Sequence, residues 1–168
     1  MSDTSANNGC QEEQVKPDLA AGDASAAEPL TEELLQRLLE SATPEAYLAQ
    51  GTTDGRSLAD YLYDLIDAKG LTRADVQRGS SVNTTFLYQI FKGERKVGRD
   101  NAICLAFGAQ CDLRETQRLL RHAGVSELWC KKRRDAIIMF CIEHGYKLVE
   151  CDDELFRLGE QTLVPREG

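Results

Sequence analysis

The chain has 168 residues, of which 42% are hydrophobic and 29% are charged, and its formal net charge at pH 7 is −8. This length suits one domain of ordinary size or two small ones. No apolar run is long enough to span a bilayer, and the N-terminus lacks a basic-then-apolar secretion signal. These features predict a cytoplasmic protein without a membrane segment.

The negative charge is concentrated at the N-terminal end. Residues 1–55 contain 2 basic and 11 acidic side chains, giving −9, whereas residues 56–110 contain 8 and 6, giving +2. Residues 111–168 contain 10 and 11, giving −1. Residues 1–29 have no hydrophobic periodicity and are rich in small and acidic side chains, so we expect a disordered acidic tail there.

Two N-terminal helices are predicted in residues 30–55. The segment 31–41 (TEELLQRLLES) is amphipathic, with its four leucines on one side. A short second helix starts at Thr43-Pro44, because proline suits the first helical position, and ends at Gly51. A further helix is expected over 57–69.

Residues 71–96 predict two short helices joined by a tight turn. Thr72 is a suitable N-cap for the first helix, and the run Gly79-Ser80-Ser81 is expected to break it. Asn83 is a strong cap for the second helix, which Gly93 then ends in a left-handed conformation. In the second helix the apolar side chains fall on one face, and Thr85, Gln89 and Lys92 fall on the opposite one.

This segment resembles the helix-turn-helix of the Cro and lambda-repressor type, the Xre-like family. The match is in register at Thr72, Val76, Val82, Leu87, Ile90 and Gly93. The resemblance implies an all-α, lambda-repressor-like bundle over residues 56–110, which binds double-stranded DNA and regulates transcription. The wider chain is similar to bacterial Xre-like proteins with a C-terminal helical extension, through YQIFKGERK at 88–96, RETQRLLRHAG at 114–124 and RRDAIIMF at 133–140.

In such a bundle the second helix of the pair enters the major groove. Thr84, Thr85 and Gln89 would then face base edges, and the Gln89 amide suits a two-pronged contact with adenine. Four cations would anchor phosphates without reading sequence: Arg73, Lys92, Lys96 and Arg99.

The C-terminal extension, residues 111–168, completes an internal duplication. A shift of 35 residues aligns 99–128 with 134–163 and gives eight identities in 30 positions, where about two are expected by chance. Both Arg99-Asp100 and Gly124 recur, as Arg134-Asp135 and Gly159. Two amphipathic hairpins can share leucine spacing by chance, but the recurring charged pair and glycine favour duplication, and we predict two stacked helical hairpins.

Enzymatic and metal-dependent functions are not favoured. The sequence has no glycine-rich phosphate loop, nucleophile elbow or HExxH zinc motif. Its six cysteines form no CxxC pair, so we expect free thiols rather than disulfides or zinc ligands. The acidic run 152–154 is assigned to the start of a helix, where negative charge complements the helix dipole. No catalytic residue, metal or cofactor is predicted.

Three alternatives stay open at the level of sequence. The lambda-repressor-like fold could instead serve as a protein-interaction module, because the second helix carries three aromatic side chains, Phe86, Tyr88 and Phe91. The basic run 131–134 could contact DNA flanks or form a solvated turn. A homodimer is predicted, through either the leucine-rich helix at 31–41 or the C-terminal hairpins, with the hairpins favoured because they are larger.

Overall fold

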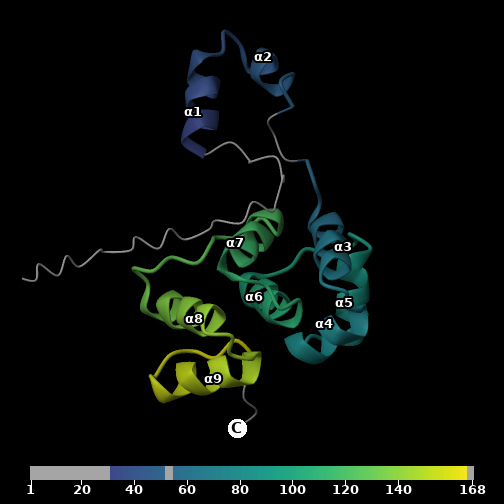
Figure 1. Ribbon diagram of the computed structural model, residues 1–168, viewed down its shortest axis with the longest axis vertical. Coiled ribbons are helices and arrows are strands. Elements are labelled where there is room, and N and C mark those ends of the chain that lie inside the picture. The colour runs from purple at the N-terminus through teal and green to yellow at the C-terminus, as the bar shows by residue number, and fades with distance from the viewer. Residues whose placement is uncertain (1–30, 52–54, 166–168) are drawn as a thin grey trace, which may run out of the picture. The chain divides into compact units, whose positions relative to one another are not determined.

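The computed structural model describes residues 31–51 and 55–165 (Figure 1). Throughout this part of the chain the regular secondary structure is helical and includes no strand, which confirms the predicted all-α class. The chain divides into two units, Met1–Thr53 and Asp54–Gly168. The acidic tail predicted at residues 1–29 lies outside the described residues.

The first unit contains helices α1 (Thr31–Glu40) and α2 (Pro44–Leu48). The Thr43 side chain caps α2 by accepting from the amide of Ala46 at 3.2 Å. None of the described side chains of residues 33–51 is buried. The leucine-rich face of α1 is therefore without a core of its own.

The second unit is built around one helix that is apolar on all sides. Its helices are α3 (Leu58–Ala68), α4 (Arg73–Ser80), α5 (Thr84–Phe91), α6 (Arg99–Gly108), α7 (Leu113–His122), α8 (Arg133–Glu143) and α9 (Leu148–Arg157). Helix α6 contacts α4, α7 and α9, and its residues 102–106 are all buried. A helix that is apolar on every side needs such all-round cover. The predicted boundary at residue 110 falls inside this unit.

Helices α4 and α5 are joined by only three residues. As predicted, Thr72 caps α4, Asn83 caps α5 and Gly93 follows α5 with a positive φ of 72°. Ser81 has a left-handed conformation (φ 55°), and Val82 is buried at the corner.

Helix α4 ends at Ser80, within the run 79–81 that was predicted to break it, and Gly79 itself is still helical. This glycine instead permits close packing of α4 on α6. A Cβ atom added to Gly79 would lie 2.9 Å from the Cα of Gly108, and one added to Gly108 would lie 2.4 Å from the carbonyl oxygen of Val76. A glycine that breaks a helix and one that admits a neighbouring helix look alike in sequence.

The two predicted hairpins, α6–α7 and α8–α9, bind each other through two reciprocal ion pairs. Arg99 binds Asp135 with two hydrogen bonds of 3.0 and 2.8 Å, and Arg134 binds Asp100 with two of 2.9 and 3.1 Å. The 35-residue shift aligns Arg99 with Arg134 and Asp100 with Asp135. Each hairpin therefore makes the same contact to the other, which is the relation that a local twofold axis creates.

Other contacts recur at the same shift. Arg99 donates to the carbonyl oxygens of Ser126 and Glu127, and Arg134 donates to those of Gln161 and Thr162, each 35 residues later. These repeated contacts fix the segment after each hairpin against the start of its first helix.

The closing segments are also held from the second helix of each hairpin. The Gln117 amide bonds the backbone of Leu128, and the Asp152 carboxylate accepts from the amides of Leu163 and Val164. Asp152 corresponds to Gln117 and lies in the middle of α9, so the predicted placement of 152–154 at a helix start is wrong. The carboxylate secures a backbone segment instead of complementing the helix dipole.

Candidate nucleic-acid interface

Helix α5 is fixed in the second unit by its apolar face. Leu87, Ile90 and Phe91 are buried, and the Phe91 ring contacts Tyr63 of α3 edge-on, with centroids 5.1 Å apart. The Asn83 side chain accepts from the amides of Thr85 and Phe86, which caps the exposed end of the helix. The orientation of α5 is therefore set by the core and by its cap.

The opposite face of α5 presents a row of polar and aromatic side chains to solvent. Thr84, Thr85 and Tyr88 are exposed, and Gln89 is partly exposed. The structure thus brings the three residues predicted to read bases, Thr84, Thr85 and Gln89, onto one accessible face. We call this row, with Tyr88, the α5 ridge.

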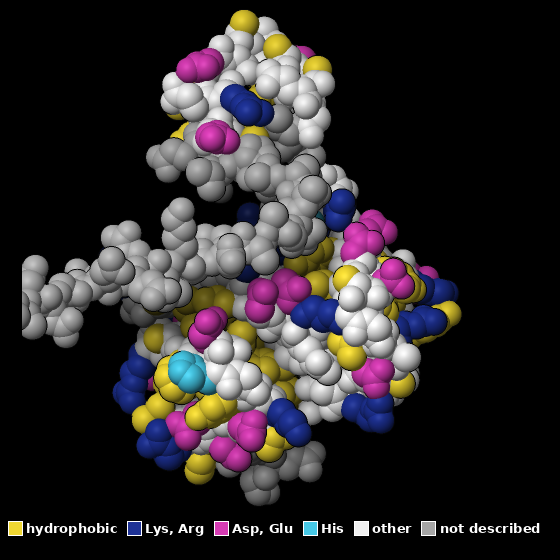
Figure 2. Space-filling view, in the orientation of Figure 1, with side chains coloured by type: hydrophobic (Ala, Val, Ile, Leu, Met, Phe, Trp, Pro, Cys, Tyr) yellow, Lys and Arg dark blue, Asp and Glu magenta, His cyan; other side chains and the backbone are white. Residues whose placement is uncertain are grey.

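Two exposed cations, Arg73 and Lys96, lie on the segments that precede and follow the ridge in the sequence. Arg73 is exposed at the first position of α4, and Lys96 is exposed in the segment after α5. Neither forms a side-chain ion pair within residues 31–51 and 55–165. Figure 2 shows Lys and Arg side chains gathered along the edge of the unit that α4 and α5 form, with acidic groups among them.

Two further cations are held over aromatic rings. The Lys92 ammonium lies 5.0 Å from the centre of the Tyr88 ring and 3.5 Å from a Glu94 carboxylate oxygen. The nearby Glu94 charge and the Tyr88 hydroxyl raise the pKa of Lys92 above its ordinary value. Arg95 lies over the Phe86 ring at 5.7 Å. The fold of the segment after Gly93 decides which ring Arg95 meets, and this contact could not be predicted from the sequence.

The fourth predicted anchor, Arg99, does not belong to this surface. Its guanidinium donates four hydrogen bonds inside the protein, two to the Asp135 carboxylate and two to backbone carbonyl oxygens. Arg99 joins the two hairpins and is withdrawn from the set of phosphate contacts.

The basic run 131–134 lies away from the α5 ridge. In Figure 1 the connection between α7 and α8 lies on the side of α6 opposite to α4 and α5. Arg133 pairs with Glu160 and Arg134 with Asp100, whereas Lys131 lies over the exposed Trp129 ring. The run is therefore partly a structural element, and it is not continuous with the cations around α5.

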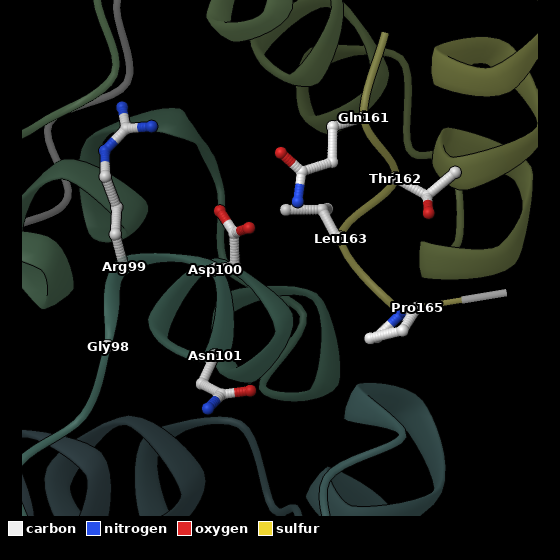
Figure 3. Close-up of a pocket in the computed structure, with 8 residues that line it drawn as sticks. All are labelled: Gly98, Arg99, Asp100, Asn101, Gln161, Thr162, Leu163 and Pro165. Carbon is white, nitrogen blue, oxygen red and sulfur yellow. The ribbon is translucent and has the colours of Figure 1, made fainter.

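One cavity of about 550 Å³ opens where the start of α6 meets the C-terminal segment (Figure 3). Its two charged side chains, Arg99 and Asp100, are both in ion pairs within the protein. The rest of the lining consists of uncharged residues, both polar and apolar: Gly98, Asn101, Gln161, Thr162, Leu163 and Pro165. It contains no nucleophile paired with a base.

The cysteines are placed as packing residues. Cys104, Cys111, Cys141 and Cys151 are buried, and Cys130 is exposed. Burial raises the pKa of the Cys104 and Cys111 thiols to about 12, which keeps them protonated at neutral pH. Among the described residues no group of three or more His, Cys, Asp or Glu side chains is placed to hold a metal ion. No helix in this part of the chain has both the length and the apolar character needed to cross a membrane.

Comparisons of the chain with protein-family models, with curated proteins and with solved structures gave no match.

Proposed function

We propose that helices α3 to α7 form a lambda-repressor-like, Xre-like unit that binds double-stranded DNA through α5 and acts as a transcriptional regulator. The observation that carries the proposal is the α5 ridge itself. A short helix, fixed by its buried side, offers hydrogen-bonding groups to solvent, and accessible cations lie on α4 and in the segment after α5. This arrangement matches what a major-groove reader needs: base-edge contacts in the centre and phosphate contacts on the flanks.

Each group has a distinct role in this proposal. Gln89 makes a two-pronged contact with adenine, and the threonines contact base edges directly or through water. Arg73, Lys92 and Lys96 bind phosphates and fix the register of α5 in the groove. Arg95 joins this set because its guanidinium lies at the same exit of α5. The protein acts by binding and carries out no chemical step.

The net charge of the chain does not oppose this function. The acidic excess belongs to residues 1–55, while residues 56–110 carry +2. Because salt screens charges separated by more than about 10 Å at 0.1 M, the charges within that distance of α5 have the most influence on binding.

Binding to random-sequence duplex DNA, measured by fluorescence anisotropy at several salt concentrations, tests the proposal. We expect affinity that falls steeply with salt, and Arg73→Gln or Lys96→Gln should each lower the slope by about one unit. Lys131→Gln is the matched control, since it removes an exposed lysine on the opposite side of α6. Equal effects of all three substitutions would place the DNA surface elsewhere.

A second candidate function is a protein-interaction module with the same fold. It is motivated by Tyr88, which is half exposed in the middle of the ridge, and by the cations held over the Tyr88 and Phe86 rings. Amphipathic aromatic rings of this kind are enriched at protein interfaces. Absence of duplex binding even at low salt would favour this function over DNA binding.

A further inference from the structure

The two hairpins have the same internal contacts but different surroundings. Hairpin α6–α7 packs against α8–α9 on one side and against α3–α5 on the other. Within the described residues, the main neighbour of hairpin α8–α9 is hairpin α6–α7. Because a local twofold relation links the hairpins, the surface of α6–α7 that receives α3–α5 has an equivalent on α8–α9. That equivalent surface is open to solvent.

The sequence of α8 is that of a helix covered on all sides. Residues 136–142 (AIIMFCI) form an unbroken apolar run, comparable with ICLAFGA at 103–109 in α6. In α6 every residue of the run except the partly buried Phe107 is buried, and Leu105 has no exposed area. Its counterpart in α8, Phe140, keeps 52% of its surface exposed. A helix with apolar residues all round and one side uncovered indicates that a partner covers that side.

The open side of α8 carries three aromatic rings in a fixed arrangement. His144 stacks on Phe140, with centroids 3.9 Å apart, and Tyr146 meets Phe140 edge-on at 6.2 Å. The His144 ring is held further by a 2.8 Å contact between its Nδ1 atom and the Phe140 carbonyl oxygen. We call these three residues the aromatic patch. Their counterparts in the first hairpin, Leu105, Ala109 and Cys111, are all buried.

We propose that the aromatic patch is a self-association surface, on which the patch of a second copy of this chain docks about a twofold axis. Twofold packing is already the way in which one hairpin of this chain binds another. Rings that are fixed before binding lose little conformational freedom when they are buried. An isologous contact also needs charges of both signs around it.

The rim of the patch meets this requirement. Glu143 and Lys147 are both exposed beside the patch, and neither forms a side-chain ion pair in the described part of the chain. A twofold copy brings Glu143 of each protomer toward Lys147 of the other. A second copy carries the same two charges, so one twofold contact can satisfy both of them.

The geometry has a consequence for DNA that rests on the proposed function. Because α8 and α5 lie on opposite sides of α6 (Figure 1), dimerisation leaves both α5 ridges exposed, at the two ends of the pair. Such a dimer suits half-sites separated by more than one helical turn, that is, by more than about 34–36 Å. The self-association itself requires no DNA, so it is tested without DNA.

Sedimentation equilibrium of the full chain at micromolar concentration tests the proposal. The wild-type protein should be a dimer, and Phe140→Lys or Tyr146→Lys should raise the dimer Kd at least about tenfold. Circular dichroism of each variant checks that the helices are intact, and both sites are partly exposed, so each replacement tests the surface more than the core.

Two matched controls place the interface. Val149→Lys adds the same charge at an exposed apolar position of α9 outside the patch, and Leu39→Lys does so on the exposed leucine face of α1. Both should remain dimers. A monomeric wild-type protein, an unchanged Kd for folded Phe140→Lys and Tyr146→Lys, or equal weakening by either control would overturn the proposal.

Discussion

The two hairpins of the second unit show how one structural plan can serve two environments. Hairpins α6–α7 and α8–α9 are joined by the reciprocal ion pairs Arg99–Asp135 and Arg134–Asp100, which we call the clamp. They also share the contacts that hold the segment after each hairpin, at a shift of 35 residues. They differ on their outer faces, where the first packs against α3–α5 and the second exposes aromatic rings. The buried polar contacts specify how the hairpins meet, and the outer faces specify what each hairpin binds.

The strongest test of this comparison is removal of the clamp. Arg99→Ala leaves the Asp135 carboxylate, which is 3% exposed, without its partner, and should lower the free energy of unfolding by about 3–5 kcal/mol. Urea unfolding measures the effect. Arg78→Ala is the control, because Arg78 pairs with Asp75 at the surface and its loss should cost less than about 1 kcal/mol. A similar loss of unfolding free energy in the two variants would mean that the clamp stabilises the protein no more than a surface ion pair does.

The close approach of α4 distinguishes the first hairpin from the second. Gly108→Ala forces a Cβ atom against the backbone of α4, and we expect a loss of about 1–3 kcal/mol in thermal or urea unfolding. Gly55→Ala, where a Cβ atom meets nothing within 4 Å, should be nearly neutral. The position equivalent to Gly108 in the second hairpin is Glu143, which is exposed. An unchanged free energy of unfolding in Gly108→Ala would contradict the close packing of α4 on α6.

In the proposed function, base reading is assigned to α5, which lies on the first hairpin's side of the unit. Gln89→Ala should weaken binding to the best duplex site by about 1–3 kcal/mol and relax preference at one base pair, with little change on random DNA. Site selection from a random duplex library, followed by anisotropy titrations, provides the comparison. An equal loss on selected and random duplexes would show that Gln89 contacts DNA without reading bases.

The clamp also predicts a dependence on acid. Burial alone raises the pKa of Asp135, but the hydrogen bonds from Arg99 and from the Trp129 amide outweigh burial, so its pKa is lower than usual. This depressed pKa contributes stability that is present above the unfolded value of about 4 and is lost as pH falls through the folded value. Denaturant unfolding between neutral pH and pH 3 should show the loss, and Asp135→Asn should reduce its steepness. An identical pH dependence in the variant would show that Asp135 does not cause the loss of stability in acid.

Local signals in the sequence predicted the helices and their caps well. Thr72 and Asn83 each supply a side-chain acceptor at a helix start, and such caps depend on neighbouring residues alone. The duplication was also visible, because it repeats residue types at a fixed spacing. What the spacing could not reveal is that the copies meet about a twofold axis, so that Arg99 binds Asp135 of the other hairpin.

The candidate site was only partly predictable for the same reason. Thr84, Thr85 and Gln89 share a face because helical periodicity places them together. Arg99 follows the cations after α5 in the sequence, yet its partner lies 36 residues away, and only the packing of the hairpins withdraws it from the surface. The end of α4 at residues 79–81 was predictable from local composition, but the close approach of Gly79 to α6 is a tertiary property that no local pattern records.

Photo-crosslinking at two matched aromatic positions tests the central claim most directly. Tyr88 on the α5 ridge and Phe140 on the aromatic patch are 51% and 52% exposed, on opposite sides of α6. Tyr88→p-benzoylphenylalanine should crosslink to duplex DNA at low salt, whereas Phe140→p-benzoylphenylalanine should crosslink only to a second copy of the protein. DNA captured from position 140, or none captured from position 88, would contradict the assignment of α5 as the DNA-binding helix.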